Sequence, residues 1–348
     1  APVNATSTMP VVFYELKDTQ PAFTADEYAL GERLVVEHVP FRTACAARGL
    51  NADDVRVDPW CPGWIDAGDD PSRRLAVPIL YLQRGDESAG DCLYLQPLDG
   101  VNMVLNMWSE PPTVVSFEWD DDAPPPPPPD PIMRFPTAAD GSELGPRPRL
   151  APLRTLQPEG RGFELSAEGV LRWQRWECTI GFNAREGAVL SCVKYAGRPV
   201  AWRLSFAEMV VPYADPHAPH HRKAAFDAGE DGLGRNAHSL DPTRCDCAPG
   251  AAAAFLDAAL VTAAGEGDVL RRAICVHEED GGLLWKHLDW RTGASVARRS
   301  RHLVIMFLTT IANYTYGFSF KLGLDASIHM EATLTGILSI GALPSEKP

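Results

Sequence analysis

The stretch LVIMFLTTIANYTYGF, which runs from Leu303 to Phe318, decides the fold class. Its first part, Leu303–Leu308, is apolar at every position, which indicates a strand buried on both faces between two layers. Tyr314 and Tyr316 follow, one residue apart. A buried tyrosine hydroxyl needs a hydrogen-bond partner, so this pair serves either packing or chemistry.

The residues around this stretch predict an all-β domain. Segments rich in branched and aromatic residues, punctuated by glycine, predict strands over Phe163–Leu165, Val170–Ile180, Ala188–Tyr195, Val200–Val211, Arg272–His277, Leu283–Trp290 and Ser327–Ile340. In the last segment apolar and polar residues alternate from Ile328 to Thr335, which predicts a half-buried strand. We therefore expect a large β-sandwich over residues 160–348. Its last strand would need a neighbour, so we expect the sandwich to be incomplete at its C-terminus.

The N-terminal third of the chain predicts a small α+β domain over residues 23–119, preceded by a tail or linker over residues 1–22. Thr24 is the expected N-cap of a first helix, because two acidic residues follow it in the first turn. A second helix is expected over Phe41–Arg48, ended by Gly49. Three strands are then predicted, over Leu75–Leu82, Asn102–Trp108 and Thr113–Trp119.

A proline-rich segment separates the two predicted domains. The sequence DDDAPPPPPPD, Asp120–Asp130, predicts a stiff polyproline linker, which we expect to continue to residue 159. The alternative is a proline-rich loop on the surface of a single domain.

Charge and composition exclude some classes of function. The chain has 348 residues and a formal net charge of −14, which disfavours binding to nucleic acid or to an anionic membrane. The longest apolar run, Leu303–Ala312, is too short to cross a bilayer. The 8 cysteines are too few for a disulfide scaffold, although Cys245 or Cys247 could pair with Cys275.

A long loop system rich in Gly, Pro, His and Asp spans Val211–Cys247. Long ordered loops on a β scaffold often carry function. Asp227 lies between Phe226 and Ala228, and an apolar setting raises the pKa of a carboxyl group towards the range of a general base. The alternative is that Asp227 caps a turn. The histidines of this loop (His217, His220 and His221) lack the regular spacing of metal ligands, so we expect them in a solvated loop.

Several blocks of the sequence resemble one known family. Thr310–Tyr316, TIANYTY, resembles the cofactor motif T-x-x-N-Y-[D/E]-Y of the copper-containing primary amine oxidases. Blocks that resemble the same family in the same order are VRVDPWCPGW, QPLDGVNMV, GFNAREGAVLS, EMVVPY, YADPHAPHHRKAAFDAGEDGLG, SLDPTRCDC, AICVHEEDGGLLWKHLDWR and LTGIL. The resemblance covers about residues 22–343.

The resemblance implies an enzyme that oxidises primary amines with O2 to aldehyde, ammonia and hydrogen peroxide. Tyr314 would be the tyrosine that copper and oxygen convert to topaquinone, and Asn313 would restrain its ring. Asp227 would be the catalytic base, and Tyr213 would hydrogen-bond the quinone oxygen.

The resemblance also implies a substrate channel, a disulfide and a homodimer. The residues implied to line the channel are Ala225, Phe226, Gly229, Leu233, Asn236, Ala312 and Tyr316. Cys247 and Cys275 would form the disulfide. Family members occur outside cells and in peroxisomes, so the resemblance leaves the compartment open.

Two departures from the family pattern bear on activity. The sequence contains no H-x-H pair, so we expect the copper ligands beyond Pro348 and interpret the chain as truncated before them. Thr315 stands where the family carries Asp or Glu. The competing hypothesis is therefore an inactive β-sandwich homologue that acts as a binding or structural module.

Overall fold

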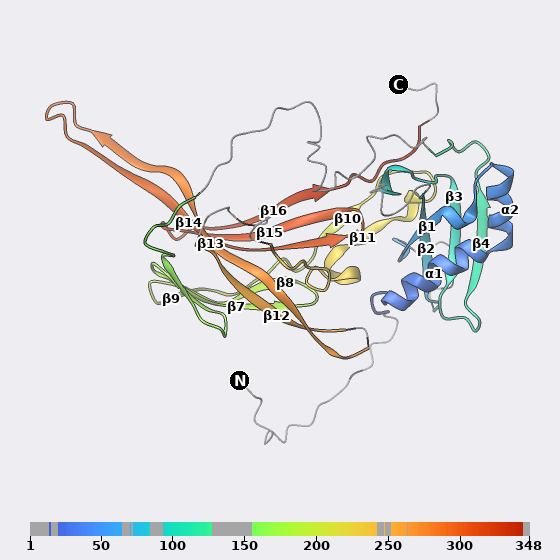
Figure 1. Ribbon diagram of the computed structural model, residues 1–348, viewed down its shortest axis with the longest axis horizontal. Helices are drawn as coiled ribbons and strands as arrows, with labels where there is room; N and C mark the ends of the chain where they lie inside the picture. The colour runs from blue at the N-terminus through green and yellow to red at the C-terminus, as the bar shows by residue number, and fades with distance from the viewer. Residues whose placement is uncertain are drawn as a thin grey trace, which may run out of the picture.

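The computed structural model describes residues 14, 20–64, 70, 72–83, 93–126, 155–241, 247, 252–262 and 264–343. Most of the predicted tail (1–22) and the central part of the predicted linker (120–159) lie outside these residues. A small α+β unit is followed by a larger unit built from two five-stranded sheets (Figure 1). The predicted fold class is therefore confirmed. Among the described helices, none is long and apolar enough to cross a bilayer.

Two helices open the small unit. Helix α1, Ala25–Glu37, begins with a capping box: the Thr24 hydroxyl accepts from the Glu27 N–H, and the Glu27 carboxylate accepts from the Thr24 N–H. The predicted N-cap is therefore confirmed. Helix α2 spans Val39–Ala47, and Gly49 follows it with a φ of +70°, a conformation that glycine adopts without strain.

The helices pack on an antiparallel sheet of order β1-β2-β3-β4. Its strands are β1 Val55–Trp60, β2 Leu75–Leu82, β3 Val101–Asn106 and β4 Thr113–Trp119, with single-turn helices at Ala52–Asp54 and Leu93–Leu95. Strand β1, which contains Pro59, was not predicted from the sequence. Proline is tolerated there because β1 is an edge strand with a partner on one side only.

The larger unit has two sheets in which consecutive strands pair antiparallel. The first contains β5 Phe163–Leu165, β6 Val170–Trp173, β7 Trp176–Asn183, β8 Gly187–Tyr195 and β9 Arg198–Leu204. The second contains β12 Ala254–Val261, β13 Gly267–Leu288, β14 Ser295–Ile311, β15 Tyr314–Gly323 and β16 Ile328–Gly336. Between them in sequence, β10 Val210–Pro212 pairs with β11 Ala224–Phe226.

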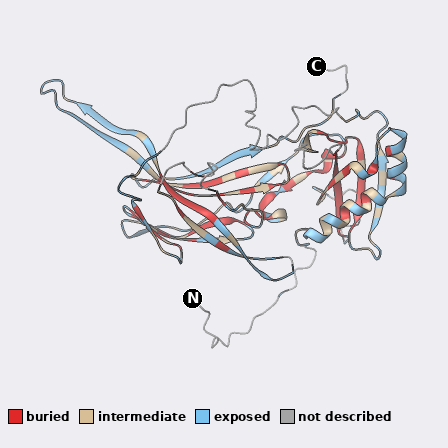
Figure 2. Cartoon of the chain, viewed as in Figure 1, coloured by how far each residue is buried: buried red, intermediate tan, exposed pale blue. Residues whose placement is uncertain are grey.

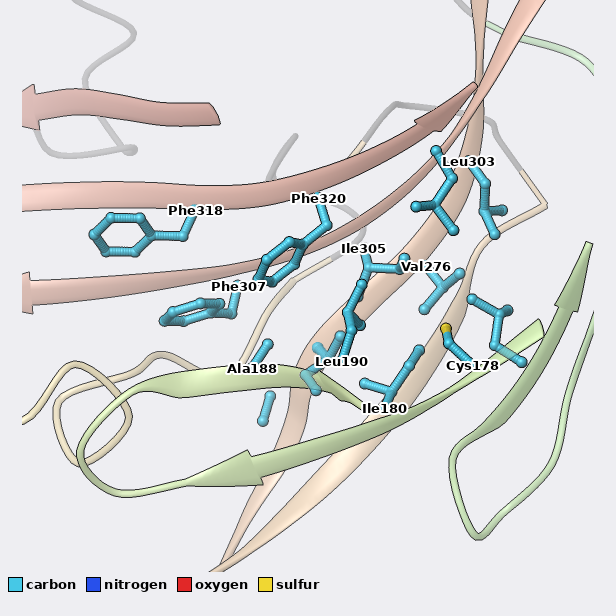
Figure 3. Close-up of a cluster of buried hydrophobic side chains, with 14 of the residues drawn as sticks. Cys178, Ile180, Ala188, Leu190, Val276, Leu303, Ile305, Phe307, Phe318 and Phe320 are labelled. Atoms are coloured by element: carbon cyan, nitrogen blue, oxygen red, sulfur yellow. The ribbon is translucent and has the colours of Figure 1, made fainter. Parts of the chain in front are cut away.

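The hydrophobic core lies between these two sheets. Figure 3 shows Ile180 and Leu190 of the β7–β8 hairpin pointing towards Ile305 and Phe307 of the facing sheet, and all four are buried. Gly187 has a φ of +73°, and a side chain there would lie 2.3 Å from the Phe307 ring. Leu303–Leu308 thus belongs to a central, largely buried strand, as predicted.

Five strand predictions were wrong in detail. Val170–Ile180 is two strands, because the chain turns at Gln174, where φ is +52°. Val200–Val211 is also two, since β9 ends at Leu204 and β10 joins a different sheet. The segments Arg272–His277 and Leu283–Trp290 both lie largely in one long strand, β13, whose register shifts between Asp280 and Leu283. The expected half-buried strand near the C-terminus, β16, is exposed along nearly its whole length.

The ends of β13 and β14 project beyond the sheet as a long hairpin arm, which we define as residues 281–299 (Figure 1). The arm is exposed along its length (Figure 2), and it carries large apolar side chains in contact with solvent. These exposed side chains are Leu283, Leu284, Trp285, Leu288, Trp290 and Val296.

Candidate active site

The site is built around the hairpin that joins β14 to β15. Ile311 pairs with Tyr314, so Ala312 and Asn313 alone form the connection. Ala312 adopts a φ of +49°, which gives the chain the reversal that a two-residue hairpin requires. The hairpin therefore fixes Tyr314 at the first position of β15.

Tyr314 and Tyr316 lie on one face of β15, because side chains alternate along a strand. Their rings stack with centroids 6.0 Å apart and an interplanar angle of 24°. Thr315 points to the opposite face, where its hydroxyl lies 2.8 Å from the Thr310 hydroxyl. The substitution of threonine for an acidic residue thus affects the face of the sheet that does not carry the tyrosine rings.

Asp227 approaches this face from the loop system. It begins a short π-helical turn, Asp227–Asp231, and its backbone N–H donates to the Met209 carbonyl over 3.0 Å. The residue is only 1% exposed, and burial raises the pKa of its carboxyl group to about 6, while a hydrogen bond from the Tyr316 side chain acts in the opposite direction. Its Oδ2 atom has no hydrogen-bond partner in the described structure. The side chain therefore faces Tyr316 with one free acceptor atom.

Tyr213 completes the connection between these groups. Its hydroxyl group hydrogen-bonds with Tyr314, and burial raises its pKa, with further contributions from Tyr314 and Asp227. The Tyr213 ring also stacks on the buried His220, with centroids 6.1 Å apart. Asp227, Tyr316, Tyr314 and Tyr213 thus form one continuous network.

Asn313 anchors the chain that follows β16. Its Nδ2 atom donates to the Ile337 carbonyl over 2.6 Å, and the Ile337 N–H donates back to the Asn313 carbonyl over 2.7 Å. This pairing brings the Ser339 N–H within 3.3 Å of the Tyr314 hydroxyl oxygen, to which it donates. The chain passes close to Asn313 at Gly336, where φ is +98° and a side chain would lie 2.7 Å from the Asn313 carbonyl oxygen. Glycine is therefore needed at this position.

The residues that the resemblance assigns to a substrate channel have different environments. Ala225 and Leu233 are buried, whereas Phe226 is 39% exposed. The Gly229 N–H donates to Glu208 over 3.2 Å. The Asn236 side chain donates from Nδ2 to two backbone carbonyls of its own loop. Its backbone carbonyl accepts from the Thr310 N–H, and this hydrogen bond connects the loop to β14. Their role in binding a substrate stays a prediction.

Three residues of this neighbourhood were not predicted from the sequence: Asp58, Trp60 and Lys223. Asp58 and Trp60 belong to β1, so the small unit contributes to the surroundings of the site. Lys223 is only 5% exposed, and its Nζ atom lies 4.2 Å from the Trp60 ring centroid and 4.4 Å from that of Tyr213. Lysine is rarely buried, so nothing local in the sequence marks it. The available signals were the two family-like blocks that contain these residues, VRVDPWCPGW and YADPHAPHHRKAAFDAGEDGLG.

The two cysteines of the implied disulfide lie in one buried cluster. Cys247 and Cys275 are both buried, and they pack with Leu240 on the face of the second sheet opposite the tyrosine rings. The Cys247 side chain hydrogen-bonds with Cys275, and this contact and burial raise the pKa of the Cys275 thiol. The disulfide itself stays a prediction.

The histidines of the loop differ in burial. His217 is exposed and lies 2.9 Å from Asp215, as expected for a solvated loop. His220 is buried, so that expectation was wrong for it; burial lowers the pKa of its imidazole. Among the described residues, no three His, Cys, Asp or Glu side chains converge to hold a metal ion. The described residues therefore do not fit a copper ion.

Comparison with known proteins gives a consistent result. The sequence model "Copper amine oxidase, enzyme domain" matches residues 165–348, and "Copper amine oxidase, N3 domain" matches residues 26–129. A peroxisomal copper-containing diamine oxidase from Nicotiana tabacum is 43% identical over 332 residues, which are 94% of this chain and 41% of the relative. A primary amine oxidase from Arthrobacter is 38% identical over 95% of this chain and 50% of the relative.

Solved structures show the same relationship. A copper-containing benzylamine oxidase from Hansenula polymorpha superposes with a TM-score of 0.79 at 30% identity, over 95% of this chain and 52% of that one. The chain thus spans about half the length of the relatives that it matches.

Proposed function

Because the chain belongs to the copper amine oxidase family, we propose that its tyrosine–carboxylate network is the catalytic centre of a primary amine oxidase. The reaction would convert a primary amine, O2 and water to an aldehyde, ammonia and hydrogen peroxide. One observation carries the proposal: Asp227 and Tyr314 belong to a single network of buried and half-buried side chains, in which Tyr316 lies next to both and Tyr213 contacts Tyr314.

Tyr314 fits the position of a quinone formed from a tyrosine. Its phenol oxygen receives hydrogen bonding from the Tyr213 side chain and from the Ser339 N–H, both of which could hold a quinone oxygen in place. The quinone supplies an electrophilic carbonyl for the amine and accepts the electrons of the substrate's C–H bond. The described residues offer no set of copper ligands.

Asp227 is suited to remove the proton from the carbon next to the amine nitrogen. With a pKa of about 6, the group is mostly carboxylate at pH 7 and is also a stronger base than an exposed aspartate. Its unpartnered Oδ2 atom is available to receive the proton, and the residue is only 1% exposed to solvent. General-base help of this kind typically contributes about 10²–10⁴-fold to rate.

The experiment that tests this function uses the product of the complete reading frame, expressed with copper and exposed to air. We expect phenylhydrazine to give a coloured adduct and the peptide containing Tyr314 to change in mass. Tyr314→Phe should abolish both signals, whereas Tyr316→Phe keeps the reactive phenol and should retain the mass change. An uncoloured protein with an unmodified Tyr314 peptide would contradict the proposal.

A second function, an inactive homologue that acts as a binding or structural module, is favoured by Thr315. The family motif has an acidic residue at this position, and here a hydroxyl pair with Thr310 replaces it. This candidate predicts an unmodified Tyr314 in the complete protein. Hydrogen peroxide released on addition of a primary amine would eliminate it.

We also propose a second copy of the chain as the partner. The hairpin arm exposes six large apolar side chains, more than an isolated solvated hairpin needs. A self-complementary contact through such an arm is the simplest way to bury them.

A further inference from the structure

Lys223 occupies an unusual position for a lysine. Its side chain enters the space between β1 of the small unit and the loop before β11, where its ammonium group faces two aromatic rings, Trp60 and Tyr213. Cations within about 6 Å of an aromatic centroid are attracted by the ring's negative face, and burial strengthens the effect. The Trp60 contact comes from one unit and the Tyr213 contact from the other.

The charged groups that face Lys223 are mostly acidic. Burial lowers the pKa of its ammonium group to about 8, and the surrounding carboxylates oppose this effect. The titratable groups that interact with it electrostatically are Asp58 on β1, Asp227, Glu230 and Asp231 on the π-helical turn, and His220 beside Tyr213. Lys223 is thus a cation close to several carboxylates, and its charge opposes the rise that burial causes in the pKa of Asp58 and Asp227.

We propose that Lys223 is a positioning residue of the site, which holds the Tyr213 ring beside Tyr314 and keeps the Asp227 carboxylate charged. This inference rests on the proposed function for its catalytic meaning, but its geometry does not depend on it. Lys223 contacts the Tyr213 ring and interacts electrostatically with Asp227. It would therefore act on Tyr314 indirectly, through these two residues.

The backbone around Lys223 explains why the side chain points inwards. The Gly63 N–H donates to the Arg222 carbonyl over 2.7 Å, and the Lys223 N–H closes a tight turn to the His220 carbonyl over 3.0 Å. A side chain at Gly63 would lie 2.5 Å from the Arg222 carbonyl oxygen, so only glycine permits this approach. The small unit therefore fixes both the direction of Lys223 and one of the two rings that hold its cation.

The test measures ionisation rather than turnover. In the full chain with ¹³C-labelled aspartate, the Asp227 carboxyl signal is assigned by its loss in Asp227→Asn and titrated by NMR. Lys223→Met, which keeps the side-chain length but removes the charge, should raise the Asp227 midpoint by about one pH unit. Lys223→Arg should leave it within a few tenths of a unit. Lys321→Met, which removes a lysine that pairs with Glu279 and Glu331 elsewhere in the unit, is the matched control and should have no effect.

An unchanged Asp227 midpoint in Lys223→Met, or an equal change in Lys321→Met, would overturn the proposal. If Lys223→Met does not fold, the unsubstituted protein still decides the question, because the Lys223 side chain can be titrated by ¹⁵N-NMR after assignment with Lys223→Arg. A midpoint near 8 agrees with a buried cation, and one above 10 shows a solvated side chain and contradicts it. Neither measurement depends on topaquinone, so failure of this inference is distinguishable from failure of the proposed oxidase activity.

Discussion

The Asp227 carboxylate and the Tyr316 side chain are hydrogen-bonded across the gap between the loop after β11 and strand β15. Tyr314, on the same face of β15, has different partners, Tyr213 and Ser339. The two tyrosines therefore hydrogen-bond with different partners, although they are only one residue apart and their rings stack. Packing therefore explains part of this pair, and the catalytic role that we propose for Tyr314 would explain the rest.

Replacing Asp227 by asparagine should stabilise the folded protein at high pH. Because the folded-state pKa is raised to about 6, the carboxyl contributes its full stability below its unfolded pKa of about 3.9 and loses it as the pH rises through 6. The neutral amide avoids this loss. Asp227→Asn should therefore be more stable than the unsubstituted protein by about 1–3 kcal/mol at pH 8, and the difference should be close to zero near pH 4.

Urea unfolding at both pH values measures this difference. Asp122→Asn, at an exposed position, is the control and should change little at either pH. A difference that is the same at pH 4 and pH 8 would show that the Asp227 carboxyl is solvated rather than buried.

Removing the Tyr316 hydroxyl should raise the pKa of Asp227 further. The hydrogen bond from Tyr316 stabilises the carboxylate form, so its loss in Tyr316→Phe leaves burial less opposed. In an active protein, the rise of kcat/KM with pH should then occur at a higher pH than in the unsubstituted enzyme. If the pH–rate profile coincides with that of the unsubstituted enzyme, Asp227 is not the base whose ionisation lowers kcat/KM at low pH.

Local signals predicted much of the fold. The Thr24 N-cap and the apolar run Leu303–Leu308 could be predicted because each depends on neighbouring residues only. The continuity of β13 could not, since Gly281 and Gly282 resemble a turn but act as an irregularity inside one strand. Likewise, Pro59 concealed β1, whose edge position is a property of the whole sheet.

In the candidate site, too, local sequence predicted single residues but not the contacts between distant segments. Burial raises the pKa of Asp227, and the apolar residues on either side of it in the sequence, Phe226 and Ala228, suggested this burial. Its contact with Tyr316 joins two distant segments, and no pattern within either segment encodes it. Lys223 was missed for a related reason: its burial depends on Trp60, which a different unit of the protein supplies.

The hairpin arm provides a prediction about assembly. Replacing Leu284 and Leu288 together by aspartate places two charges among its exposed apolar side chains. We expect dimerisation to weaken by at least about tenfold, because burying even one unpaired charge costs more than about 1.4 kcal/mol. Sedimentation equilibrium measures the change, and Val261→Asp, which charges another exposed apolar position, is the control. An unsubstituted protein that stays monomeric at high concentration would contradict the proposed partner.

Cys247 and Cys275 lead to a prediction about redox chemistry. Their contact in a buried cluster means that a bond needs little movement of the chain, and such a cross-link typically contributes about 2–4 kcal/mol. The raised pKa of Cys275 keeps it as a thiol, which is a poor nucleophile, so the bond should form during folding and only slowly in the folded reduced protein.

Peptide mapping without reductant after oxidative refolding should find the two cysteines joined. Cys275→Ser should lose both the cross-link and the stability difference between oxidised and reduced samples, whereas Cys192→Ser, at an exposed cysteine, should keep both. Free thiols at both positions after oxidative refolding would show that this contact does not become a bond.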